Sequence, residues 1–152
     1  MKHARLDTQS CPIARGLDRV GEWWNILILR DAFRGKTRFD QFQKSLAIAP
    51  NILSRRLRGL VDAGLLEKVR YSQRPPRDEY HLTAIGRDFR PVLWAMLAWG
   101  NRHFMPDGQD VQPVDSATGL RADPVMMDGI TGKRLDQATP RPNSPIESRS
   151  QS

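Results

Sequence analysis

The feature that most constrains this chain is a pair of helical patterns separated by only three residues. Apolar residues recur at helical spacing over 39–46, and a second helix is expected at 50–63. Pro50 suits the first turn of the second helix, and Gly64 suits the position just past its end. Because only residues 47–49 join the two helices, the sequence predicts a helix-turn-helix.

Further helices are expected on both sides of this pair. Helical spacing predicts one at 12–20 and a second, almost wholly apolar one from Trp24 to Phe33, which should be buried on most sides. Thr37 is placed to cap the helix at 39–46, and Thr83 to cap a last long helix.

Between the helix-turn-helix and the last helix, the sequence predicts a hairpin. Strand patterns at 65–71 and 78–82 flank a loop at 72–77 that contains Pro75 and Pro76. The expected fold class is therefore mainly α with a small β-hairpin wing (α+β), a winged helix-turn-helix.

Composition divides the chain near residue 104. Residues 1–104 carry 19 Lys and Arg against 10 Asp and Glu, whereas residues 105–152 carry 5 against 7 and more than half of the eleven prolines. We expect a folded domain at 1–104 and a tail at 105–152, with a small hairpin near 123–135 and a disordered C-terminal end. The basic body favours a polyanionic partner, either nucleic acid or an anionic membrane surface.

The single cysteine, Cys11, cannot form an intramolecular disulfide. The sequence has neither a secretory leader nor an apolar run long enough to span a membrane. We therefore expect a cytoplasmic protein without a membrane partner.

The helix at 50–63 has one apolar and one cationic face. Its inward positions are Leu53, Leu57, Leu60 and Val61, which leaves Asn51, Ser54, Arg55 and Arg58 on the opposite side, with Arg56 at the margin. The major groove of B-DNA admits one helix, and Arg to guanine and Asn to adenine are common specific contacts. A solvated charged face is the alternative. The short turn before the helix and the basic hairpin after it favour DNA.

The hairpin is basic as well, and its prolines stiffen the tip. Arginine suits both phosphates and a narrow minor groove, although positive charge also keeps an exposed edge hairpin soluble. We expect contact with double-stranded DNA from Arg38, Pro50, Asn51, Ser54, Arg55, Arg56, Arg58, Lys68, Arg70, Arg74 and Arg77.

Two other classes of function use a winged helix. A protein-interaction module would more often expose apolar surface, and a reader of RNA sequence would offer exposed aromatic rings, which residues 51–58 lack. A catalytic thiol at Cys11 would need a neighbouring base, and none is adjacent. The sequence therefore favours a DNA-binding protein and not an enzyme.

No metal or cofactor is expected. His3, His81 and His103 lie far apart without companion cysteines, so no spacing predicts a zinc site. Gly132-Lys133 lacks both the first glycine and the following Ser or Thr of a phosphate-binding loop.

The residues of the first hundred positions resemble a known family, the HxlR-type winged-helix regulators of bacteria and archaea, which are related to the MarR regulators. The resemblance spans about residues 11–100. It is carried by Cys11-Pro12, Trp24, Ile28-Leu29-Arg30-Asp31, Arg38-Phe39-Asp40, Leu53, Arg56-Leu57, Gly64-Leu65, Pro76-Arg77, Glu79-Tyr80, Leu82-Thr83, Gly86, Pro91-Val92 and Trp99.

This resemblance implies a homodimer, built through the N-terminal segment and the last long helix, that acts as a repressor or an activator. Dimeric readers of this kind bind a pseudo-palindromic operator whose half-sites lie ~34 Å apart or a multiple of that. The interface residues expected are Ile13, Leu17, Phe89, Val92, Leu93, Met96 and Trp99.

Three residues depart from the pattern of the resembling family. Trp23 stands where a basic residue is common, Ala49 where a capping Ser is frequent, and Asp78 where a small apolar residue is usual. We expect these changes to alter phosphate contacts or an effector pocket between the wing and the helices. The family's operator preference therefore does not transfer to this chain.

Cys11 precedes Pro12 at a helix start, where backbone N–H groups favour the thiolate. Some members of the resembling family sense electrophiles or oxidants with a cysteine at this place. Two interpretations stay open: a redox sensor that alters DNA affinity, and a buried, unreactive cysteine that packs as a small hydrophobe. The expected function is a sequence-specific, dimeric transcription regulator that, in the first interpretation, responds to an oxidant, an electrophile or another small molecule.

Overall fold

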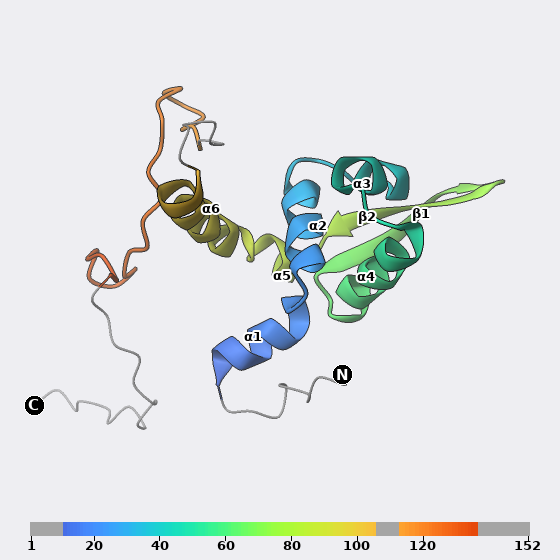
Figure 1. Cartoon of the computed structure of the whole chain (residues 1–152), viewed down its shortest axis with the longest axis horizontal. Coiled ribbons are helices and arrows are strands. Elements are labelled where there is room, and N and C mark those ends of the chain that lie inside the picture. The colour runs from blue at the N-terminus through green and yellow to red at the C-terminus, as the bar shows by residue number, and fades with distance from the viewer. Residues whose placement is uncertain (1–10, 106–112, 137–152) are drawn as a thin grey trace, which may run out of the picture. The chain divides into compact units, whose positions relative to one another are not determined.

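The first unit of the chain, Met1–Met96, contains the helix-turn-helix and the hairpin (Figure 1). The computed structural model describes residues 11–105 and 113–136. The elements of this unit are α1 (Pro12–Val20), α2 (Trp23–Phe33), α3 (Phe39–Leu46), α4 (Pro50–Asp62), β1 (Leu66–Gln73), β2 (Pro76–Leu82) and α5 (Ala84–Arg87). Helix α6 (Arg90–Phe104) begins here and ends in the second unit, Leu97–Ser152. The prediction of a mainly α fold with a β-hairpin wing is confirmed.

Helix α2 forms the centre of the first unit because its apolar residues contact neighbours on most sides. Ile28 and Leu29 are fully buried, and α2 contacts α3, α4 and β2. Phe42 of α3 packs against them, together with the α4 residues Leu53, Leu57 and Leu60. Each of these buried leucines stabilises the fold by about 2 kcal/mol.

The turn of the helix-turn-helix consists of residues 47–49, as predicted. Ala47 ends α3 in the left-handed region, with φ of 49°. Ala49 is the N-cap residue of α4 and has no side-chain cap, but its carbonyl accepts from the N–H of Leu53 at 2.9 Å. Pro50 follows in the first turn, where its missing N–H removes no helical hydrogen bond.

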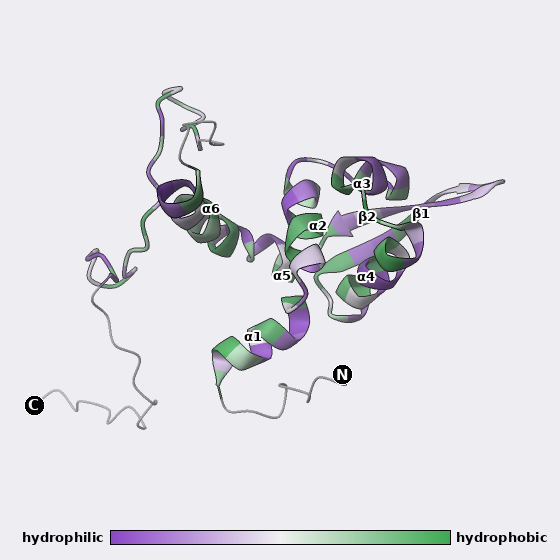
Figure 2. Cartoon of the chain, viewed as in Figure 1, coloured by the Kyte–Doolittle hydropathy of each residue, from purple (hydrophilic) through white to green (hydrophobic). Residues whose placement is uncertain are grey.

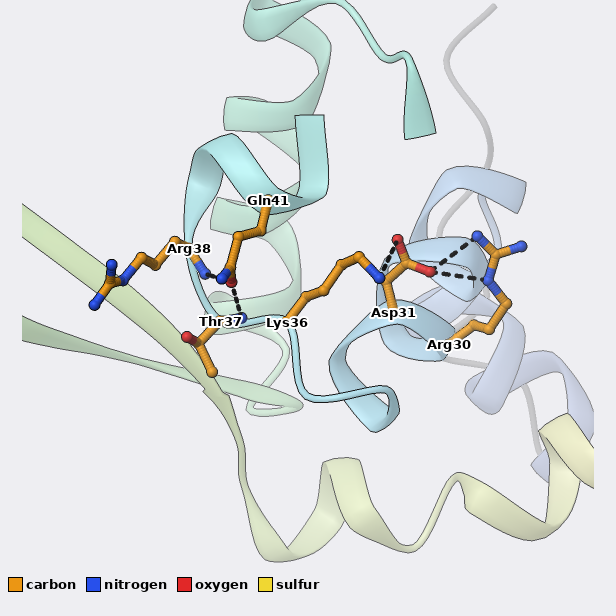
Figure 3. Close-up of polar contacts among 6 residues, drawn as sticks. All are labelled: Arg30, Asp31, Lys36, Thr37, Arg38 and Gln41. Carbon is orange, nitrogen blue, oxygen red and sulfur yellow. Dashed lines mark hydrogen bonds and ion pairs between the residues drawn. The ribbon is translucent and has the colours of Figure 1, made fainter. Parts of the chain in front are cut away.

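Asp31 of α2 is fully buried and has a basic residue on each side (Figure 3). Arg30 donates to its Oδ1 through Nε at 3.0 Å and Nη2 at 2.9 Å. Nζ of Lys36 lies 4.0 Å from Oδ2, close enough for ionic attraction but too far for a hydrogen bond. The Lys36 N–H also donates to the Asp31 carbonyl at 3.1 Å. Asp31 thereby fixes the turn that leads from α2 to α3.

Helix α3 begins with Arg38 as its N-cap residue, so the expectation that Thr37 caps it is wrong. Oε1 of Gln41 accepts from the backbone N–H of Thr37 at 3.0 Å and of Arg38 at 3.1 Å (Figure 3). The Thr37 carbonyl accepts from the N–H of Tyr80 in β2 at 2.7 Å. This pairing with the wing holds Thr37 outside the helix, and the glutamine side chain caps it instead.

The wing is longer than expected, and its turn is tighter. Strands β1 and β2 pair antiparallel from Leu66↔Leu82 to Gln73↔Pro76. The predicted loop at 72–77 is therefore wrong, because only Arg74 and Pro75, joined by a cis peptide bond, lie between the strands. The pairing shifts between Arg70 and Ser72, which makes Tyr71 the extra residue of a bulge.

The last long helix expected after Thr83 is in fact two helices, α5 and α6. Thr83 caps α5 as predicted, since its Oγ1 accepts from the Gly86 N–H at 3.0 Å and donates to the Gly64 carbonyl at 2.6 Å. A Cβ on Gly86 would lie 2.0 Å from the carbonyl oxygen of Leu65. The close packing of α5 on the start of β1 therefore requires glycine at this position.

The second unit contains a short internal repeat that the sequence analysis missed. Asp115, Thr118, Gly119 and Arg121 recur thirteen residues later as Asp128, Thr131, Gly132 and Arg134. Each copy forms a small hairpin with one bridge, Val114↔Arg121 or Met127↔Arg134. In each copy the threonine hydroxyl donates to the aspartate, and the glycine has a positive φ.

These hydrogen bonds stabilise the charged form of both repeat aspartates. They lower the pKa of Asp115, chiefly through the Thr118 N–H, and the pKa of Asp128, chiefly through the Thr131 hydroxyl. The second hairpin lies within the segment 123–135. The expected boundary near residue 104 stays a prediction, and the C-terminal end expected to be disordered lies outside the described residues.

Candidate nucleic-acid interface

Helix α4 presents a polar face to solvent. Leu53, Leu57 and Leu60 are fully buried on one side, whereas Asn51, Ser54, Arg55 and Arg58 are exposed, as is Pro50. Within the described parts of the chain, neither Arg55 nor Arg58 forms an ion pair. Their guanidinium groups are therefore available to a ligand without breaking an existing interaction.

Arg56 lies apart from this face. Its Nη2 is 3.0 Å from Oε2 of Glu22, the N-cap residue of α2, and its side chain is only 18% exposed. Helical spacing placed Arg56 at the margin of the cationic face, but its ion pair directs it toward the junction of α1 and α2. We therefore leave it out of the proposed DNA contacts.

Two basic residues of the wing are partly neutralised by Asp78. Nζ of Lys68 lies 2.9 Å from Asp78 Oδ2, and Nε of Arg70 lies 3.0 Å from Oδ1. The hydrogen bonds from Lys68 and then Arg70 lower the pKa of Asp78, and the bond to Asp78 raises the pKa of Lys68. The wing is consequently less positive than its count of basic residues suggests.

Arg74 and Arg77 lie at the tip of the wing and are exposed. In the described residues no ion pair engages either of them. Arg74 occupies the two-residue turn, and Arg77 pairs with Ser72 across the strands. The tip is therefore the part of the wing whose positive charge has no internal partner.

Arg38 joins the start of α3 to the wing. Its Nε donates to Oε1 of Glu79 at 3.0 Å, and its guanidinium lies 4.7 Å from the ring centre of Tyr71. A hollow of about 520 Å³ lies here, lined by residues that include Arg38, Asp40, Tyr71 and Arg77. The hollow lies between the wing and α3, the region in which an effector pocket was expected from the sequence.

The residues expected at a dimer interface divide into two groups. Ile13 and Leu17 of α1, and Val92, Met96 and Trp99 of α6, are exposed, Ile13 to 74% and Trp99 to 57%. Figure 2 shows such hydrophobic residues along both helices. Leu93 is half-buried, and Phe89 packs against the core of its own chain. The second group is therefore less available to a partner.

Cys11 is a free, exposed thiol at the N-cap position of α1. In the single chain, the interpretation of Cys11 as a buried hydrophobe is therefore wrong. Across residues 11–105 and 113–136, no three His, Cys, Asp or Glu side chains group as metal ligands. In the same residues, no helix is long and apolar enough to cross a membrane.

Three features of the chain were not predicted from the sequence. Glu22 pairs with Arg56 across 34 positions of the chain, and no local pattern reveals such a pair. Asn25 is buried in α2, as Asp31 is, and a polar residue among the apolar ones at the start of that helix was a visible signal. The repeat of residues 115–121 at 128–134 was also visible in the sequence. Its period of thirteen residues is shorter than the periods of about 20–50 residues that are typical of solenoids and propellers.

Comparison with known proteins places these elements in a family. The sequence profile of the HxlR-like helix-turn-helix matches residues 19–108, more than half of the chain. Rv3095, an HTH-type transcriptional regulator of Mycobacterium tuberculosis, is 38% identical over 133 residues, which make up 86% of this chain and 84% of that protein.

Solved structures show the same fold. The crystal structure of PA1607, described as a candidate transcription factor, is 39% identical and superposes with a TM-score of 0.82, covering 92% of this chain and 99% of that chain. The reduced form of the redox regulator HypR is 33% identical, with a TM-score of 0.57, and covers 62% of this chain and 97% of that chain.

Proposed function

The chain belongs to the HxlR-like helix-turn-helix family, whose matched relatives are transcriptional regulators and not enzymes, and on that premise we propose that it binds a pseudo-palindromic operator as a homodimer. Helix α4 enters the major groove with Asn51, Ser54, Arg55 and Arg58 toward the bases. The wing contacts the flanking backbone through Arg74 and Arg77, with Lys68, Arg70 and Arg38 in support.

This proposal rests on the exposure of the polar side chains of α4 and on the lack of ion pairs at its outward arginines. Asn51, Arg55 and Arg58 are exposed, and neither arginine has an ion pair in the described part of the chain. Structural arginines on a protein surface often pair with nearby carboxylates, as Arg56 and Arg70 do here. Unpaired donors on a helix that follows a tight turn suit the base edges of the major groove.

The dimer is proposed from the exposed apolar side chains of α1 and α6. Large exposed apolar groups, such as Ile13 on α1 and Trp99 on α6, mark candidate interaction surfaces. A two-fold dimer would cover them and would set the spacing of two recognition helices. Trp99→Lys is expected to shift the protein from dimer toward monomer in sedimentation experiments. Phe89 and Leu93, the less exposed residues of the expected interface, are less suited to this test.

The test of operator binding uses purified protein, the DNA upstream of its own gene and random duplex as competitor, over a titration of salt. We expect competitor-resistant binding by a dimer. Equal, steeply salt-dependent binding to both DNAs would leave only nonspecific attraction and would count against the proposal.

A second proposal concerns redox response through Cys11. The thiol is exposed, and the similar structure HypR is described as a redox regulator, which favours a redox response in this chain. Oxidation or alkylation of Cys11 is expected to change operator affinity in the wild type but not in Cys11→Ser. Unchanged affinity of the treated wild type would remove the sensor.

A further inference from the structure

A cavity of about 670 Å³ lies beside α4, at the junction of α1 and α2. Its lining includes Leu17, Glu22 and Asn25 from that junction and Arg56, Gly59 and Asp62 from α4. This volume falls within the range of small-molecule sites. The exposed residues Asn51, Ser54, Arg55 and Arg58 are not among its lining, so the cavity is separate from the proposed DNA contacts.

Two buried polar atoms of the lining residues have no hydrogen-bond partner in the described chain. They are Oδ1 of Asn25, a residue that is 8% exposed, and Nε of Arg56. Arg56 already uses Nη2 for Glu22. Leaving a buried polar atom unpaired costs about 1–3 kcal/mol. The amide oxygen lacks a donor and the guanidinium N–H lacks an acceptor. Both atoms are closed to solvent in this conformation, so a ligand that carries both groups reaches them only when the contact between Arg56 and Glu22 opens.

Gly59 keeps this cavity open on the side of α4. A glycine in a helix interior costs about 1 kcal/mol relative to alanine. A Cβ at position 59 would meet no atom within 4 Å, so packing within the chain does not require glycine. A larger side chain at this lining position would reduce the volume available to a ligand.

The charges of the lining select the kind of ligand. The lining includes three acidic residues, Asp18, Glu22 and Asp62, and two basic residues, Arg19 and Arg56. Both signs are present, with a small excess of negative charge that disfavours a simple anion. Ala63 adds apolar surface for a side chain.

We propose that this cavity binds an amino acid or a close derivative, whose ammonium group donates to Asn25 Oδ1 and whose carboxylate or carbonyl oxygen accepts from Arg56 Nε. This assignment rests on the two unpaired atoms, on Gly59, whose missing side chain leaves space in the cavity, and on the mixed charges of the lining.

The test compares three probes that share one ring and differ only in their polar groups: phenylalanine, phenethylamine and 3-phenylpropionate. Each is titrated into the full-length, ¹⁵N-labelled protein, and the amide signals of Gly21 and Gly59 and the Nε–H signal of Arg56 are followed. Phenylalanine is expected to shift these signals saturably. The affinity of each probe that lacks one polar group should be lower by about tenfold or more. No saturable shift with phenylalanine, or equal binding of all three probes, would overturn the proposal.

Two substitutions at one position locate the binding. Gly59→Leu narrows the cavity from the α4 side, whereas Gly59→Ala leaves most of it open. Both residues favour a helix over glycine, so both variants should fold. We expect Gly59→Leu to lose phenylalanine binding by about tenfold or more and Gly59→Ala to keep it. Wild-type binding by Gly59→Leu would place the ligand elsewhere and would overturn the assignment.

The regulatory consequence rests on the proposed function, because α4 carries both Arg56 and the residues proposed to read DNA. A ligand that competes with Glu22 for Arg56 should alter operator affinity in the wild type but not in Gly59→Leu. NMR binding without operator recognition would overturn the proposed function alone. Operator recognition without NMR binding would overturn the cavity site alone.

Discussion

Arg38 and Glu79 form an ion pair across the gap between α3 and the wing, with 3.0 Å between Nε and Oε1. The two residues also form an isolated β-bridge, and the carbonyl of the preceding Thr37 accepts from the N–H of Tyr80. Arg38 further lies over the ring of Tyr71 in β1. These contacts set the position of the wing relative to the helix-turn-helix, and with it the position of Arg74 and Arg77, the DNA contacts proposed at its tip.

The first prediction follows from the charge of Glu79. The hydrogen bond from Arg38 lowers the pKa of this carboxyl below its usual range. A carboxyl whose folded pKa is lowered adds stability above its unfolded pKa and loses it as the pH falls through the folded value. Melting temperatures of the wild type should therefore fall more steeply than those of Glu79→Gln as the pH drops from about 5 to 3.

Glu67→Gln is the matched control, because Glu67 is exposed in β1 and forms no ion pair in the described residues. It should retain the pH dependence of the wild type. Parallel melting curves for the wild type and Glu79→Gln would show that the pair does not stabilise the wing.

The helix-turn-helix was predictable because its signals are local. Apolar spacing and Pro50 placed the second helix at 50–63, and the structure has Pro50–Asp62. The face bearing Asn51, Arg55 and Arg58 followed from the same helical period. Where neighbours in sequence decide the structure, reasoning from the sequence alone was sufficient.

The errors arose where tertiary contacts decided the structure. Thr37 is a good capping residue, but pairing with Tyr80 holds it outside α3. Arg56 lies on the margin of α4 by its spacing, yet Glu22 draws it away from the cationic face. A partner so distant in the chain leaves no mark in the local pattern, so the cavity beside α4 could not be predicted.

The second prediction concerns Asp78, which pairs with both Lys68 and Arg70. Asp78→Asn removes its charge and frees two cations for phosphate contacts. Because each new contact adds about 0.9 to the salt slope, the logarithmic salt dependence of binding to random duplex should steepen by about 1–2. Asp88→Asn is the control, because Asp88 is the C-cap residue of α5 and pairs with neither Lys68 nor Arg70. If both variants steepen the slope equally, net charge and not the local pairing is responsible.

The third prediction separates base reading from phosphate contact. Arg55→Ala should cost about 1–3 kcal/mol at the operator and relax base preference, whereas Arg74→Ala should weaken binding to all sequences and reduce the salt slope by about 1. Competition binding against operators with single base changes measures both effects. Equal losses on every sequence for both variants would contradict the division of roles between α4 and the wing.

The fourth prediction concerns Gly86, which lets α5 pack against the start of β1. An added Cβ would lie 2.0 Å from the Leu65 carbonyl oxygen, and backbone atoms cannot move aside as a side chain can. Gly86→Ala should therefore lower the free energy of unfolding by about 3 kcal/mol. Gly59→Ala is the opposite case, since its Cβ meets nothing within 4 Å and should stabilise α4 by up to about 1 kcal/mol. Urea denaturation at one fixed protein concentration measures both, because a dimer's stability depends on concentration. A Gly86→Ala variant as stable as the wild type would mean that α5 can shift from β1 at little cost.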